Sequence, residues 1–215
     1  MKIVAVVPMK LNNRRLANKN IKEFSNGDCL CNYILKTLLS IKLIDEVYVY
    51  CSDPCIKDYI PDGVSFFKRS NTLDYDTTKM NEVLSCFARD VDADVYVMTH
   101  TTSPFIKAES IIKGLESVIS GKYDSSFAAK KVQEFLWKDG EPFNYKLDNI
   151  PRTQDLPLIM QETSGFYIYK RNIINDLGRR IGENPYIVEV SEIESVDIDE
   201  EEDFLIADAI FNHLM

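Results

Sequence analysis

The chain has 215 residues, of which 45% are hydrophobic and 27% charged, and its formal net charge at pH 7 is −9. This composition is typical of a globular protein with one sizeable core, so we expect a single domain over residues 1–215. The acidic balance argues against nucleic-acid binding, and the first apolar run, which ends at Pro8, is too short for a signal peptide or a membrane span. We therefore expect a cytoplasmic protein that binds a small ligand rather than a membrane or nucleic acid.

The first 130 residues alternate apolar runs with helical patterns, which predicts parallel strands joined by crossover helices. Strands are predicted at 2–7, 46–51, 64–67 and 94–98. Helices are predicted around 34–41, 80–91 and 111–119, with a short helix opening at Pro54. The pattern indicates an α/β fold with a doubly wound, mostly parallel sheet, in which strand 94–98 is central.

The pattern changes after Asp124. Two apolar runs flank Asp139-Gly140, a dipeptide favoured in two-residue turns, so a β-hairpin is predicted to protrude from the main sheet. The surrounding segment, residues 132–162, holds more apolar side chains than a lone arm keeps in water. We interpret it as a dimerisation arm and expect a homodimer. Strands at 165–169 and 186–190 and a helix from Glu201 are predicted to follow.

The loop after the first strand reverses the acidic balance of the chain. Its cations are Lys10, Arg14, Arg15, Lys19 and Lys22, and no acid interrupts them. Ligands of open α/β sheets bind at the carboxyl ends of strands, and phosphates need several converging donors. We assign to nucleotide binding the residues Pro8, Met9, Lys10, Leu11, Asn12, Asn13, Arg14, Lys19 and Asn20. The alternative is a solvated basic loop without a ligand.

Two carboxylates alternate near the other end of the chain, in Val196-Asp197-Ile198-Asp199-Glu200. In an extended segment, alternate side chains lie on one face, which places Asp197 and Asp199 together. Carboxylate oxygens are ligands that Mg²⁺ prefers, so we expect Mg²⁺ as the cofactor. A cationic loop for phosphates and a carboxylate pair for a metal together predict phosphoryl or nucleotidyl transfer.

Five blocks of this sequence, in order, resemble the acylneuraminate cytidylyltransferases, the family of CMP-sialic acid synthetases. The first block is the basic loop, in which Lys10, Arg14 and Lys19-Asn20 match the family's cations and closing Lys-Asn. The family's two glycines are replaced by Leu11 and Asn12, and its Pro-Gly by Ala17-Asn18. The resemblance implies the nucleotide-diphosphosugar transferase (Rossmann-like) type of sheet.

The second and third blocks are 68–78 and 100–106. By resemblance, Arg69 and Thr77 or Thr78 hold the nucleotide, although Asp76 or Thr77 is equally suited to cap the next helix. In the third block His100 replaces a glutamine and Ile106 an arginine; His100 and Thr102 are acceptor-binding candidates. His100 suits a hydrogen bond to the acceptor, a base, or a purely structural role.

The fourth block covers 151–157 and 161–169, and the fifth covers 197–204. The acceptor-binding candidates of the fourth block are Arg152, Gln154, Glu162, Ser164 and Gly165. Gly165 either lets the chain pass closely under the ligand or serves a simple turn. The fifth block matches the family's Asp-Ile-Asp-x-x-x-Asp-Phe without departure, and Asp203 is suited to cap or charge the final helix.

The resemblance implies that the chain binds CTP with Mg²⁺ and transfers CMP to a small anionic acceptor, a sialic-acid-like sugar, with release of pyrophosphate. The residues expected to act in catalysis are Lys10, Arg14, Lys19 and Asp199, with the metal on Asp197 and Asp199. Three alternatives stay open: another anionic acceptor such as a phospho-polyol or phosphonate, a glycosyltransferase that uses the Asp-x-Asp pair, and a non-catalytic nucleotide-binding relative.

Overall fold

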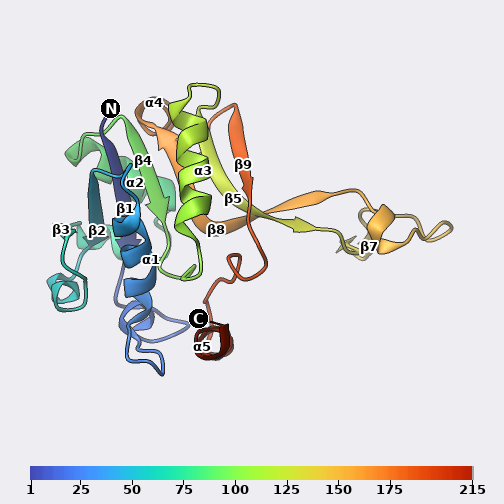
Figure 1. Ribbon diagram of the computed structural model, residues 1–215, viewed down its shortest axis with the longest axis horizontal. Coiled ribbons are helices and arrows are strands. Elements are labelled where there is room, and N and C mark those ends of the chain that lie inside the picture. Colours follow the sequence, from blue (N-terminus) through green and yellow to red (C-terminus); the bar gives the residue numbers. More distant parts are fainter. Residues whose placement is uncertain (215) are drawn as a thin grey trace.

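Seven strands form the central sheet of the computed structural model, which describes residues 1–214 (Figure 1). Their order is β3 (Val64–Lys68), β2 (Glu46–Cys51), β1 (Ile3–Met9), β4 (Val95–Thr99), β8 (Ile159–Lys170), β5 (Ser125–Val132) and β9 (Pro185–Glu189). Neighbouring strands are parallel except at β8, which runs antiparallel to both β4 and β5. The predicted mostly parallel sheet with β4 at its centre is confirmed.

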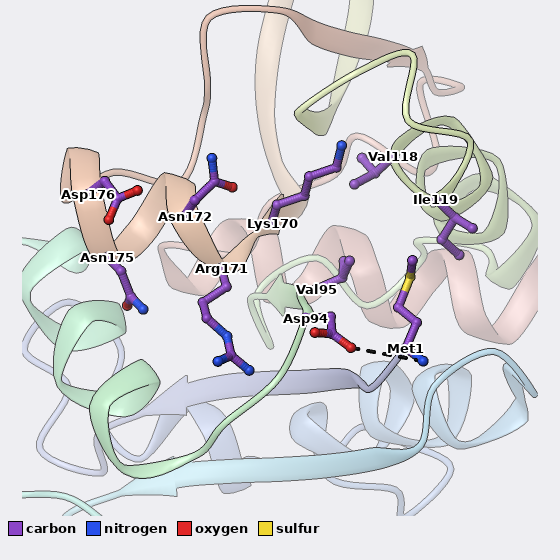
Figure 2. Close-up of a pocket in the computed structure, with 10 residues that line it drawn as sticks. All are labelled: Met1, Asp94, Val95, Val118, Ile119, Lys170, Arg171, Asn172, Asn175 and Asp176. Atoms are coloured by element: carbon purple, nitrogen blue, oxygen red, sulfur yellow. Dashed lines mark ion pairs between the residues drawn. The ribbon is translucent and has the colours of Figure 1, made fainter.

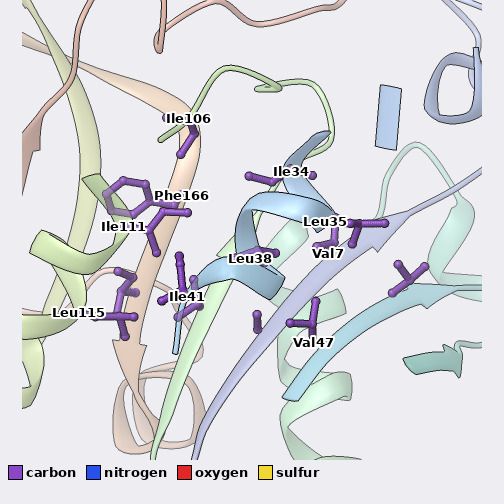
Figure 3. Packing of buried hydrophobic residues seen from close by; sticks show 14 of the residues in the cluster. Val7, Ile34, Leu35, Leu38, Ile41, Val47, Ile106, Ile111, Leu115 and Phe166 are labelled. Carbon is purple, nitrogen blue, oxygen red and sulfur yellow. The ribbon is translucent and has the colours of Figure 1, made fainter. Parts of the chain in front are cut away.

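Helices cover both faces of the sheet, as a doubly wound fold requires. On one face α1 (Leu30–Ser40) and α3 (Ala108–Ile119) bury an apolar stripe against the strands, and Figure 3 shows Leu38, Leu115 and Phe166 in that layer. The opposite face carries α2 (Met80–Asp90) and α4 (Arg171–Leu177). Helix α4 was not predicted, because seven residues give too short a run for helical periodicity to be recognised.

Short 3₁₀ turns occupy several loops: η1 (Lys19–Ile21), η2 (Pro54–Asp58), η3 (Asn71–Asp74) and η4 (Thr153–Asp155). None of the helices within residues 1–214 has the length and apolar character needed to cross a membrane.

Strand β1 extends two residues beyond its predicted end, so Pro8 and Met9 are buried in the strand rather than placed in the loop. Proline donates no ladder hydrogen bond and is usually excluded from central strands. Here β4 pairs with β1 only as far as Val6, whereas β2 pairs with it as far as Met9. Pro8 therefore lies where β1 has a partner on one side only.

The C-terminal helix α5 (Glu201–Leu214) packs against the basic loop and the start of α1 rather than against the sheet. The rings of Phe24 and Phe204 stack with centroids 4.3 Å apart, and Ile198 is fully buried in the same cluster. On the surface above it, Lys22 pairs with Glu201 at 2.6 Å. This packing carries the segment before α5, with its two aspartates, to the cationic loop.

An arm projects from the sheet where β5 and β8 continue beyond it as a two-stranded ribbon that ends at Val132 and Ile159 (Figure 1). The predicted hairpin is present at its far end as β6 (Trp137–Lys138) and β7 (Glu141–Pro142). Asp139 and Gly140 have φ angles of 53° and 84°, the left-handed pair that a type I′ turn needs.

Candidate active site

The cationic loop lies at the carboxyl end of β1, as predicted, and carboxylates of this chain face its cations. Lys10 Nζ donates to Asp76 Oδ1 at 3.0 Å, and Arg14 Nη1 lies 2.6 Å from Asp76 Oδ2. The hydrogen bond from Lys10, followed by the charges of Arg14 and Lys10, lowers the pKa of Asp76. Because Arg14 is largely exposed, these pairs add little stability, and an incoming anion can replace the carboxylate at small cost.

Lys19 and Asn20 close the loop and are both buried. Lys19 Nζ donates to the carbonyl oxygen of Ile198 at 2.7 Å and to Asp199 Oδ1 at 3.2 Å. Asn20 donates to the Lys10 carbonyl at 2.7 Å and accepts from the Thr101 hydroxyl at 2.5 Å, so it ties the loop to the end of β4. Asn18, which stands at a family glycine, has φ 52°, a left-handed conformation that asparagine tolerates.

The two aspartates of the fifth block flank Ile198, whose side chain is buried while theirs are only partly covered. The Ile198 amide donates to the carbonyl of Thr102 at 2.8 Å, which fixes the segment at the end of β4. Ser164 Oγ donates to Asp197 Oδ2 at 3.0 Å. Asp203 accepts from the amides of Asp199 and Glu200, at 2.9 and 2.8 Å, and so caps α5 as predicted.

These carboxylates fit a divalent cation. Asp197 Oδ1 is buried and has no hydrogen-bond partner within the described residues. A buried carboxylate oxygen without a partner costs free energy unless a ligand satisfies it. No group of three or more His, Cys, Asp or Glu side chains within residues 1–214 is placed to hold a metal. A two-carboxylate site leaves most of the coordination of Mg²⁺ to water and phosphate oxygens, which is how Mg²⁺ is usually bound in phosphoryl-transfer sites.

Two hollows adjoin the loop. One, of about 290 Å³, is lined by Lys10, Asn13, Arg14, Arg15, Leu16, Lys19 and Asp76. The other, of about 400 Å³, lies beyond β2 and β3 and is lined by Leu11, Asn12, Ser52, Asp53, Pro54, Lys68, Asn71 and Asp74. The side-chain oxygen Oδ1 of Asn13, which lines the first hollow, is also buried without a partner among residues 1–214. The loop residues predicted to bind nucleotide thus surround space of molecular size.

Arg69, the predicted nucleotide residue of the second block, is buried and engaged with a carboxylate. Its Nε and Nη2 lie 3.1 and 2.6 Å from Asp74 Oδ1, and Ser52 donates to the other oxygen of Asp74 at 2.5 Å. Arg69 therefore holds Asp74 at the wall of the larger hollow. Neither Asp76 nor Thr77 caps α2, because Lys79 is the N-cap residue and makes no side-chain cap. Thr78 donates only a long 3.4 Å hydrogen bond, to the Thr72 carbonyl.

On the other side of the aspartates, His100 follows β4 at the same edge of the sheet. Burial, with smaller contributions from the charges of Arg180 and Lys19, lowers the pKa of His100 to about 4, against an opposing effect of Asp199. The imidazole is therefore neutral at pH 7 and is better suited to a hydrogen bond than to carrying a charge.

Glu162 accepts a short hydrogen bond from Tyr167 and lies 3.7 Å from Arg180.

Three predicted acceptor residues have surroundings that the sequence did not indicate. Arg152 and Gln154 lie at η4, within the arm, where Arg152 pairs with Asp155 at 2.7 Å. Figure 1 shows the arm extending away from the sheet, so within this chain these residues are not brought to His100. Gly165 lies inside β8, so the turn interpretation is wrong. A Cβ atom at Gly165 would collide with the side chain of Ile106, so the glycine makes room for that buried isoleucine.

Two residues of this edge were missed as site residues. Arg15 lies 2.8 Å from Asp199 Oδ1 and 3.8 Å from Glu200 Oε1, and its place in the basic loop was the available signal. Arg180 follows α4, in a segment without a recognisable motif, and only the fold brings it close to Glu162.

A larger hollow, of about 690 Å³, lies at the opposite edge of the sheet, where Figure 2 shows Asp94, Lys170 and Arg171 around it. The N-terminal amine of Met1 is 4.0 Å from Asp94 there. This is the amino end of β4, whereas open α/β sheets bind their ligands at the carboxyl ends of parallel strands. The candidate active site is therefore the edge that carries the loop and the aspartates.

Comparison with known proteins agrees with this geometry. Residues 4–207 match the family described as cytidylyltransferase. The chain belongs to the cytidylyltransferase family. N-acylneuraminate cytidylyltransferase of Oncorhynchus mykiss is 26% identical over 216 residues, which cover 96% of this chain and 49% of that protein. The bifunctional pseudaminic acid cytidylyltransferase and hydrolase of Helicobacter pylori is 24% identical, with 92% of this chain and 40% of that protein covered. The chain thus spans half or less of the curated relatives it matches.

Solved structures show the same fold. A structure of CMP:2-keto-3-deoxy-manno-octonic acid synthetase complexed with CTP superimposes with a TM-score of 0.77 over the full length of both chains, at 15% identity. The 4-diphosphocytidyl-2C-methyl-D-erythritol synthase of Anaerococcus prevotii gives 0.72 over 99% of this chain and 96% of that one, also at 15% identity. The fold and the family resemblance inferred from the sequence are both confirmed.

Proposed function

We propose that this chain transfers CMP from CTP to an acidic sugar of the sialic-acid type, with release of pyrophosphate. The observation that carries the proposal is the buried Asp197 Oδ1, which has no hydrogen-bond partner among residues 1–214. It lies near Asp199, at the edge of the sheet that also holds the cationic loop. Family membership supports the nucleotide, and the names of the relatives in Oncorhynchus mykiss and Helicobacter pylori support an acidic sugar as acceptor.

The acidic and the basic residues of the site have different proposed roles. Asp197 and Asp199 would hold Mg²⁺, which supplies neutralisation of the triphosphate when bound. Lys10, Arg14 and Lys19 bind phosphate oxygens and stabilise the charge that develops on the departing pyrophosphate. The acceptor hydroxyl oxygen forms a bond to the α-phosphorus as the bond to the β-phosphate oxygen breaks, and the hydroxyl proton passes to water. Arg15, which contacts Asp199, contributes a further cation at the same place.

The arm is the second part of the proposal. Its exposed apolar side chains include Trp137, Phe143, Leu147 and Ile150, each more than half exposed. A monomer rarely leaves so much apolar surface uncovered, so we propose a homodimer in which a second copy packs on the arm. In that assembly Arg152 and Gln154 remain acceptor-binding candidates, toward a site shared between the copies. The cytoplasm is the proposed location.

The test is pyrophosphate release from the purified chain with CTP and Mg²⁺. The acceptors are one acidic nine-carbon sugar, one eight-carbon sugar acid, one phosphorylated polyol, one phosphonate and one neutral sugar, each assayed alone. Pyrophosphate release with a sugar acid supports the proposal. Release with only the phosphorylated polyol or the phosphonate would show that the acceptor belongs to that class instead. Measurable CTP binding without release from any acceptor would identify a non-catalytic relative. A parallel incubation replaces CTP with a nucleotide sugar, and consumption of that nucleotide sugar would favour a glycosyltransferase.

A further inference from the structure

Arg180 lies beside two side chains of β8, and within residues 1–214 its guanidinium makes no ion pair closer than 3.7 Å. The guanidinium carbon lies 3.7 Å from the centre of the Tyr167 ring, a stacked cation–π contact. Nη2 lies 3.7 Å from Glu162 Oε1, which is longer than a hydrogen bond. Glu162 Oε1 itself accepts a hydrogen bond from the Tyr167 hydroxyl. The ring and the carboxylate therefore orient the guanidinium and leave its donors for another oxyanion.

The position of Arg180 connects it to the reacting edge of the sheet. Glu162 and Ser164 lie two residues apart on β8, and Ser164 donates to Asp197, one of the two candidate metal ligands. The imidazole of His100 lies within electrostatic range of Arg180, Lys19 and Asp199. Through Glu162 and Ser164 on β8, Arg180 is therefore linked to the candidate metal ligand Asp197.

A hollow of about 430 Å³ lies in front of Arg180, a volume suited to a small molecule. Its lining residues are Lys79, Met80, Asn81, Glu162, Arg179, Arg180, Ile181 and Gly182. Arg179 is paired with Glu183, so Lys79 and Arg180 provide its available positive charge. Helix α2 also begins there without a side-chain cap, which leaves amide donors at the same wall.

We propose, on the basis of the proposed function, that Arg180 binds the anionic group of the acceptor and selects acceptors that carry one. A planar guanidinium forms two parallel hydrogen bonds to a carboxylate or a phosphate, and a neutral hydroxyl gives no such pairing. Arg180 is thus a specificity-determining residue that binds the acceptor from within a single chain, while Arg152 remains a candidate in the proposed dimer. Acceptors with a carboxylate, phosphate or phosphonate near the reacting hydroxyl are bound, and neutral polyols are rejected.

The experiment compares Arg180→Met and Arg180→Lys with the wild type, at saturating CTP and with the acceptor that gives pyrophosphate release. Arg180→Met is expected to raise the KM for the acceptor about 10- to 100-fold and to leave the KM for CTP within about twofold, because only the acceptor loses a charged partner. Arg180→Lys keeps the positive charge but loses the planar guanidinium and its stacking on Tyr167. Its KM for the acceptor is expected to lie between those of the wild type and Arg180→Met. Arg89→Met, an exposed arginine on α2, is the matched control and should leave both constants unchanged.

Calorimetric titration with each acceptor, in the presence of a non-hydrolysable CTP analogue, gives a second readout that does not require turnover. The inference is supported if the wild type binds a sugar acid or a phosphorylated polyol and Arg180→Met does not. This result would stand even if no pyrophosphate is released and the proposed function fails. An unchanged acceptor KM in a folded, active Arg180→Met would overturn it, as would a wild type that binds neutral and anionic acceptors equally. The sugar-acid and phosphate titrations identify which oxyanion the site takes.

Discussion

The basic loop over residues 10–20 and the arm over residues 132–162 both leave the sheet from the carboxyl ends of parallel strands, β1 and β5, but they expose opposite chemistry. In the loop, the cations face carboxylates of the same chain, Asp76 and Asp199. In the arm, Trp137 and Leu147 are 56% and 62% exposed. The cations of the loop already meet carboxylates within one chain, which suits the proposed exchange for a small anion. The arm exposes apolar side chains, which we propose a second copy covers.

The largest expected effect tests the loop as a phosphate and metal site. Asp199→Asn removes the proposed metal ligand and the partner of Arg15 and Lys19, so pyrophosphate release is expected to fall by at least about 100-fold. The thermal midpoint should change little, because Asp199 is partly exposed. Glu200→Gln is the matched control, since Glu200 is exposed and meets Arg15 only at 3.8 Å. Equal activity of the two variants would remove Asp199 from the chemistry.

The arm is tested by its solution mass. Wild-type protein is expected to show about twice the chain mass of 24.7 kDa by light scattering. The double variant Trp137→Ser and Phe143→Ser is expected to show the monomer mass with a similar thermal midpoint, because both side chains are already exposed within one chain. Leu205→Ser, which removes an exposed side chain of α5, should leave the dimer intact. A monomeric wild type would contradict the assignment of the arm.

A smaller effect concerns His100, which follows β4 at the edge of the sheet that carries the candidate site. Its pKa is about 4 in the folded chain and about 6.5 in the unfolded chain, so above pH 6.5 the imidazole is neutral in both states. Below that pH the unfolded chain takes up the proton first, and stability is lost as the pH falls through the window from 6.5 to 4. Between pH 7 and pH 5 this loss is expected to reach about 2 kcal/mol.

Urea unfolding at the two pH values measures this loss, with His100→Gln as the reference that cannot titrate. The wild type should lose more stability between pH 7 and pH 5 than the variant does. Equal losses in both proteins would show that His100 titrates normally and is not desolvated at the site.

The smallest expected effect concerns the start of α2. Thr77→Ala should change the free energy of unfolding by less than about 0.5 kcal/mol, because Lys79 and not Thr77 is the N-cap residue. Ser70→Ala is the comparison, since Ser70 accepts from the Thr72 amide at 3.3 Å and caps η3; a loss of about 0.5–1 kcal/mol is expected there. Urea denaturation measures both free energies of unfolding. A loss of stability above about 1 kcal/mol for Thr77→Ala would show that Thr77 does cap the helix.

Local patterns predicted most of the sheet and part of the site. Strand and helix periodicities located β1 to β4 and α1 to α3, and the Asp-Gly dipeptide located the hairpin. They failed where a signal was short or was changed by neighbours: α4 has seven residues, and Pro8 is tolerated in β1 only because β4 stops pairing at Val6. The antiparallel direction of β8 has no local signature at all, because strand direction depends on the path of the chain between elements.

The sequence by itself determined the family, the sheet type and the two charged motifs, because these depend on residue types and spacings within short segments. Only the tertiary structure decided which charges meet. It brought Lys19 to Asp199 across 180 residues and placed Arg180 beside Glu162. It also buried Asp197 Oδ1 where no other group of the described residues 1–214 gives it a hydrogen bond. It also set Arg152 apart on the arm. Long-range contacts of this kind arise from packing, here of α5 against the basic loop and of β8 between β4 and β5, which no local pattern records.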